Sequence, residues 1–186
     1  MTTTRNGSAL RWLPTLLAFP IGGLVANLIA GPVDGLVAAL LAGAITGLVL
    51  GAIQAWAMGT NGPPADRWIA ATAAGLALGL ALGSAVVGHG TSLGDLVVQG
   101  AICGLAIGAA QAAALRPRLG CLAYAWIPTL GALWAAGWAI TTAIGVDVES
   151  QYTVFGSSGA LFVTAATAVL PVLLANRADC AAASVS

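Results

Sequence analysis

The chain has 186 residues, of which 59% are hydrophobic and only 6% are charged, and its mean hydropathy is +0.97. A water-soluble domain carries about a quarter of its residues as charged side chains, so the composition excludes an ordinary soluble fold. Six basic and six acidic residues leave no net charge, and the basic residues form no cluster. Because phosphate binding needs clustered Lys and Arg, nucleic acid is excluded as a partner.

Six segments are long and apolar enough to cross a membrane, which takes about 20 residues in a helix. They cover residues 12–30, 35–58, 68–88, 96–115, 124–145 and 154–175. Turn sequences separate them, namely Gly31-Pro32, Gly59 to Pro64, Gly88 to Gly94, Arg116-Pro117-Arg118 and Asp147 to Gln151. The sequence therefore predicts an all-α polytopic bundle of six transmembrane helices, with residues 1–186 as a single membrane domain.

The charges predict an orientation for these spans. Arginines flank the first span's start, the second and fourth turns and the chain's end, as Arg5, Arg11, Arg67, Arg116, Arg118 and Arg177, whereas Asp34, Asp95, Asp147 and Glu149 fall in the intervening turns. Because Lys and Arg near span ends stay in the cytoplasm, we expect both termini to be cytoplasmic. All basic residues are arginine, and Ala and Gly are abundant, a bias typical of GC-rich bacteria. We therefore expect a multi-pass protein of the bacterial inner membrane.

A twelve-residue stretch occurs twice, which indicates an internal repeat. GAITGLVLGAIQ at residues 43–54 returns as GAICGLAIGAAQ at residues 100–111. Residues 12–16 (WLPTL) also resemble residues 126–130 (WIPTL), while the last segment keeps only Gly159-Ala160-Leu161. The sequence predicts three repeated helical hairpins at approximately residues 11–58, 67–115 and 124–175, the last one diverged.

Glycines spaced four residues apart form three ladders, each on one face of a helix. Small residues let transmembrane helices approach closely, which drives their association in lipid. We therefore expect these glycine zippers to pack helices together: Gly43, Gly47 and Gly51; Gly75, Gly79 and Gly83; Gly100, Gly104 and Gly108.

Polar side chains inside apolar spans need partners, because an unpaired amide in hydrocarbon costs several kcal/mol. Gln54 and Gln111 close the two copies of the repeat, and Asn27 lies near the outer end of the first span. Each glutamine either bonds across helices or contacts a solute, a lipid headgroup or a cofactor. All three residues are candidates for a ligand site or a solute path.

The tryptophans fall into two groups. Trp134 and Trp138 lie four residues apart within the fifth span and share one face. They either pack on a neighbouring helix or contact a ring-shaped lipid, quinone or pigment. Trp12, Trp68 and Trp126 begin their spans at the cytoplasmic side, where we expect them to anchor the helices in the aromatic belt.

Residues for catalysis or metal binding are poorly represented. His89 is the single histidine and lies in an outer turn, whereas a metal site needs three or four ligands. We find no nucleophile–base set and no carboxylate pair that could share a substrate. The sequence therefore predicts a protein that is not an enzyme, and it names no metal or cofactor.

The pattern Gly-x-x-x-Gly-x-x-Gln before an inner turn, followed by a helix that begins with Trp, resembles small multi-pass bacterial membrane proteins described as hypothetical. The resemblance implies a fold and no activity. Size and span number are also similar to those of the substrate-binding subunits of energy-coupling-factor vitamin transporters, without a matching ligand motif.

Two function classes follow from the sequence. The first is a non-catalytic membrane protein that packs against a larger membrane complex as an accessory or scaffold subunit, or binds an apolar lipid or cofactor. The second is a small-solute channel or an uncoupled transporter, including a vitamin-transporter substrate-binding subunit. Expected partners are the lipid bilayer, other membrane subunits or further copies of the chain.

Overall fold

The computed structural model describes residues 10–146 and 157–183, and every regular element in these residues is a helix. After one helical turn at residues 10–12, the chain forms α2 (Thr15–Ala30), α3 (Leu36–Met58), α4 (Ala65–Val87), α5 (Leu93–Leu119), α6 (Trp126–Ala143), α7 (Ser157–Thr167) and α8 (Val169–Ala183). Two 3-10 helices, η1 (Gly59–Asn61) and η2 (Gly120–Ala125), follow α3 and α5. The expected all-helical class is confirmed.

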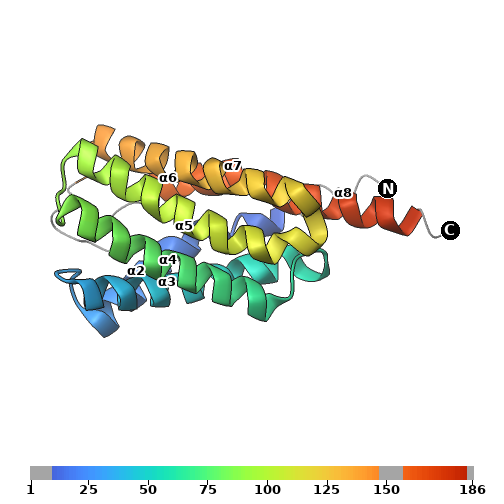
Figure 1. The fold of residues 1–186 in the computed structure, drawn as a ribbon, viewed down its shortest axis with the longest axis horizontal. Helices are drawn as coiled ribbons and strands as arrows, with labels where there is room; N and C mark the ends of the chain where they lie inside the picture. The colour runs from blue at the N-terminus through green and yellow to red at the C-terminus, as the bar shows by residue number, and fades with distance from the viewer. Residues whose placement is uncertain (1–9, 147–156, 184–186) are drawn as a thin grey trace.

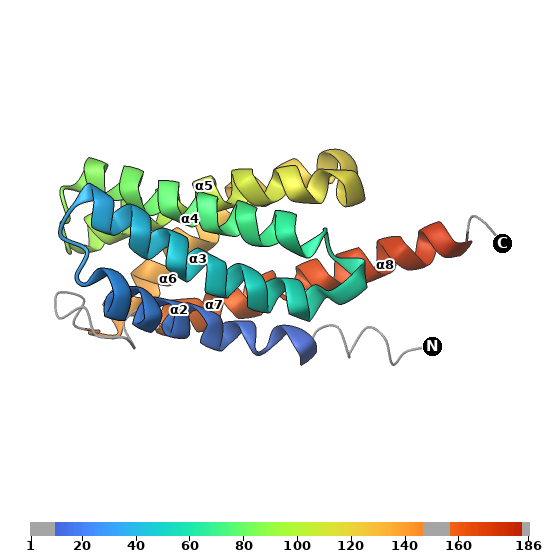
Figure 2. The same ribbon diagram turned by 90° about the horizontal axis from the view of Figure 1, so that it is seen from below.

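The helices form an elongated bundle whose members run up and down its long axis (Figure 1). From α2 to α7, each helix packs on the one that follows it in the chain, and α7 also packs on α2. The six helices therefore close into a ring. α8 continues from α7 and projects past the bundle, at the end where α2 begins (Figure 2).

Within the described residues, five helical runs are long and apolar enough to span a membrane, which confirms a membrane-type bundle. Four of them correspond to the expected first, second, third and sixth spans. The remaining run is Leu93–Ala143, a continuous stretch of 51 residues that contains α5, η2 and α6. Within it, α5 and α6 pack against each other, so the run doubles back on itself at η2.

Two expected boundaries differ from the structure. The turn expected at Arg116-Pro117-Arg118 is wrong, because α5 continues through Pro117 to Leu119 and the chain reverses in η2. Proline lacks a backbone N–H group, so Pro117 removes one helical hydrogen bond close to the end of α5, where the helix tolerates the loss. The last expected segment is interrupted at Ala168, between α7 and α8. The expected turn at Asp147 to Gln151 lies outside the described residues.

The glycine ladders lie at the contacts between successive helices. A Cβ added at Gly47 in α3 would lie 2.6 Å from the Cα of Ala73 in α4, and one added at Gly79 in α4 would lie 2.7 Å from the Cα of Cys103 in α5. On α5, Gly108 stands in the same relation to Ile127 of α6. Each ladder therefore faces the next helix in the ring. Leu48 and Leu105, by contrast, are exposed, as lipid-facing residues would be.

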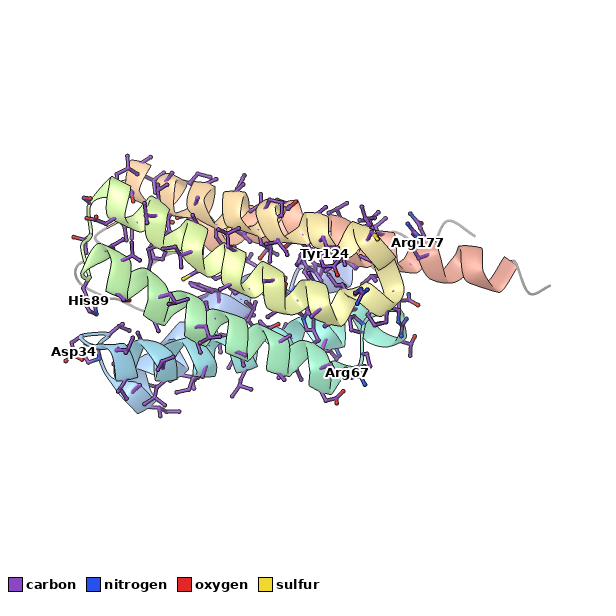
Figure 3. All side chains as sticks on the ribbon, viewed as in Figure 1. Asp34, Arg67, His89, Tyr124 and Arg177 are labelled. Carbon is purple, nitrogen blue, oxygen red and sulfur yellow. The ribbon has the colours of Figure 1, made fainter. Side chains whose placement is uncertain are left out.

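The polar groups separate toward the two ends of the bundle. Arg67, Tyr124 and Arg177 lie at one end, and Asp34 and His89 lie at the other (Figure 3). Arg11 donates to the Trp56 carbonyl oxygen at 2.7 Å, and Arg118 donates to the Asn61 carbonyl oxygen at 3.1 Å. We name these the arginine end and the His89 end.

Candidate functional site

A hydrogen-bonded network of glutamine and tryptophan lies inside the ring toward the arginine end. Trp68 Nε1 donates to Gln54 Oε1 at 3.1 Å, and Trp126 Nε1 donates to Gln111 Oε1 at 2.8 Å. Gln111 Nε2 donates to Thr72 Oγ1 at 2.9 Å and to Gln54 Oε1 at 3.4 Å. These hydrogen bonds link α3, α4, α5 and α6. The side chains of both glutamines therefore have protein partners.

The same geometry occurs where the ring closes. Trp12 Nε1 donates to Thr167 Oγ1 at 3.3 Å, across 155 residues of sequence. Thr167 lies eleven residues after Gly156, just as Gln54 follows Gly43 and Gln111 follows Gly100. In each case, a tryptophan at or near the start of a helical run donates to the polar residue at this position in a helix beside it.

The burial of Trp12 and Trp68 does not fit the expectation that they anchor the bundle in the membrane interface, whereas for Trp126 this expectation stays a prediction. Trp12 and Trp68 are 1% and 0% exposed, and Trp126 is half-buried. Their indole N–H groups need acceptors, and the acceptors are inside the ring. Trp56 is the exposed tryptophan at this end, and the Arg11 guanidinium lies 5.2 Å from its ring centroid.

A small cavity of about 60 Å³ lies within the ring, beside the glutamine network. Its walls come from α2, α3, α5, α6 and α7 and include Gln54, Gln111, Thr15, Thr167, Trp134 and Trp138. One water needs about 10–15 Å³ of such volume, so this inner cavity has room for a few water-sized groups and is the smaller of the two cavities.

A second cavity of about 240 Å³ lies toward the His89 end. Its walls come from α2 to α6 and the neighbouring loops, and they include Asn27, Thr46, Ser84, His89 and Gln99. None of the described residues that line it is Asp, Glu, Lys or Arg. This outer cavity suits an uncharged molecule, because a buried charge without a partner is costly.

Aromatic side chains separate the two cavities. Phe19 and Trp138 line both. The Phe19 ring also meets Trp134 edge-on, with ring centroids 5.5 Å apart and an interplanar angle of 78°. Phe19 and Trp138, which we call the aromatic partition, lie between the outer cavity and the inner one, and Trp134 supports Phe19 from the inner side.

The sequence candidates are therefore divided between two places. Gln54, Gln111, Trp134 and Trp138 lie around the inner cavity, while Asn27, which is exposed, lies at the outer cavity. Sequence reasoning missed Phe19, Ser84 and Gln99. Gln99 had one usable signal, since it is an amide within an apolar span, like Gln54.

The residues in the described ranges contain no group of three or more His, Cys, Asp or Glu side chains that could hold a metal ion. No family model, curated protein or solved structure matches this chain. The cavities and their walls are therefore the basis for a functional proposal.

Proposed function

We propose that this chain is a non-catalytic integral membrane protein that binds a small, largely apolar molecule in the outer cavity, against the aromatic partition. The observation that carries the proposal is the cavity of about 240 Å³, whose described walls hold no Asp, Glu, Lys or Arg and which is floored by Phe19 and Trp138. Ligand sites are typically concave and mostly apolar, with a few polar groups that orient the ligand. The glycine ladders are occupied by contacts within the ring, so they support this role better than docking to another subunit.

In this proposal the ring crosses the bacterial inner membrane six times, as three hairpins formed by α2 with α3, α4 with α5 and α6 with α7. The hairpin at η2 supports separate crossings by α5 and α6, and the three Trp-to-Gln or Trp-to-Thr bonds support the repeat. The arginine end faces the cytoplasm, so the outer cavity lies toward the opposite side.

Binding is tested with 4-fluorotoluene and the protein in lipid nanodiscs, using fluorine NMR and empty nanodiscs as the blank. We expect a saturable bound signal. Ala42 lines the outer cavity and is 6% exposed, so Ala42→Leu fills the site and should weaken binding at least tenfold. Ala52→Leu on the same helix is exposed and should leave binding unchanged. No saturable signal, or equal binding by both variants, would contradict the proposal.

A small-solute channel or uncoupled transporter, such as a vitamin-transporter subunit, is the second candidate. The placement of both cavities on either side of the aromatic partition favours it. Passage would require Phe19 to move from Trp134. Light scattering by proteoliposomes after a glycerol or urea step tests it: flux in the parent that rises in Phe19→Ala supports a path, and parent and variant rates equal to those of empty liposomes exclude one for these solutes.

A further inference from the structure

Gln99 is an amide within the membrane-type part of α5, and it is 7% exposed. Its Nε2 donates to the Leu80 carbonyl oxygen of α4 at 3.3 Å and to Cys103 Sγ at 3.5 Å. Its Oε1, by contrast, is the buried side-chain oxygen that has no hydrogen-bond partner among the described residues. The nitrogen of this amide thus has hydrogen-bond partners, and its oxygen has none.

The missing donor does not come from the adjacent helices. Backbone N–H groups inside α4 and α5 are used in their own helical hydrogen bonds. The amide also lies flat against Gly83 of α4, where an added Cβ would stand 2.5 Å from Oε1. Because Gly83 has no side chain, the Gln99 amide fits against α4. No group of the described residues donates to its oxygen there. A buried acceptor in this condition costs about 1–3 kcal/mol.

The outer cavity supplies the route by which a donor from outside the chain can reach Gln99. Gln99 is one of its wall residues, and the hydroxyl-bearing residues Thr46 and Ser84 line the same space. Oε1 itself is enclosed, so an outside donor reaches it only when the amide rotates about the last side-chain torsion, which has a broad energy profile. This rotation exchanges the places of Oε1 and Nε2 and releases the two long Nε2 bonds to Leu80 and Cys103. The amide then presents an acceptor to a bound molecule.

We infer that Gln99 selects ligands of the outer cavity that are uncharged and carry an O–H or N–H donor, which Gln99 Oε1 accepts while the aromatic partition contacts the apolar part. This inference rests on the proposed binding function and adds the chemical class of the ligand. It predicts a preference for phenol-like or amide-like molecules over hydrocarbons of the same shape.

The test compares 4-fluorophenol with 4-fluorotoluene, which differ by a hydroxyl in place of a methyl group. Both are titrated by fluorine NMR into protein-containing nanodiscs and corrected for partition into empty nanodiscs. We expect the phenol to bind about tenfold more tightly, the upper end of what one neutral hydrogen bond contributes. This comparison uses only the parent protein, so it does not depend on a variant that folds.

Gln99→Met keeps the length of the side chain and removes the acceptor, so the preference for the phenol should disappear while toluene binding stays. Leu82→Met, on the exposed face of α4, is the matched control and should keep the preference. Equal affinity of the two probes for the parent, or a preference that survives in Gln99→Met, overturns the inference and leaves the proposed function standing. Absence of binding by either probe overturns both.

Discussion

The indole of Trp12 donates to the hydroxyl of Thr167, and this bond of 3.3 Å joins the first helical run of the bundle to α7. Thr167 also donates to the Val163 carbonyl oxygen at 2.7 Å, within its own helix. Its hydroxyl thus accepts a bond from Trp12, in the helical turn before α2, and donates one within α7. This hydroxyl links the first helical run to α7 at the place where the ring closes.

Thr167→Val should destabilise the protein, because the valine side chain has nearly the same shape but leaves Trp12 Nε1 buried without an acceptor. The expected cost is about 1–3 kcal/mol, measured by unfolding in mixed micelles. Thr129→Val is the control, since the exposed Thr129 donates to the Ala125 carbonyl of its own helical region at 2.7 Å. Equal costs for the two variants would show that the Trp12 bond does not stabilise the closure.

Gln54→Leu and Gln111→Leu should each destabilise the fold, because each strands one indole N–H, that of Trp68 or of Trp126. The glutamines also share a bond, so the double variant should cost less than the sum of the single ones, by about 0.5–1.5 kcal/mol. The same unfolding measurement applies. Binding of 4-fluorotoluene in the outer cavity should not change, and its loss in all three variants would place the ligand at the glutamines instead.

Gly47→Ala should destabilise the bundle by about 1–3 kcal/mol, because the new Cβ would lie 2.6 Å from the Cα of Ala73. Gly23→Ala is a matched control within a helix, since nothing lies within 4 Å of its added Cβ. There, alanine should be neutral or stabilising by up to about 1 kcal/mol, owing to its helix propensity. Similar unfolding free energies for the two variants would contradict the packing role of the α3 ladder.

Cys121 is exposed in η2, near Tyr124 at the arginine end. In a Cys180→Ser background, an impermeant maleimide should leave Cys121 unlabelled in intact cells and label it after permeabilisation. His89→Cys, in a variant that also carries Cys121→Ser, reports on the opposite end and should be labelled in intact cells. The reverse pattern would invert the proposed orientation.

The hydrophobic pattern determined much of the architecture by itself. Apolar runs of about 20 residues exclude a soluble fold, and glycines at every fourth position put small residues on one helix face wherever that helix packs. Both are local properties of the chain, so the helical class could be predicted, while the packing role of the ladders stays a prediction that Gly47→Ala tests. The one-sided arginines likewise indicated which helix ends lie together, and the structure places Arg67 and Arg177 at one end.

Only the tertiary structure decided which polar groups meet. Nothing in the sequence pairs Trp12 with Thr167. The sequence position of Trp68 is typical of an interface anchor, but in the structure its N–H group donates to Gln54. Gln99 is recognisable in sequence as an amide within an apolar span, but only the structure shows that it packs against Gly83, that its oxygen has no donor and that it lines a cavity. Hydropathy reports how a residue partitions between water and lipid, whereas a hydrogen bond or a cavity depends on which helices are neighbours and how they are rotated.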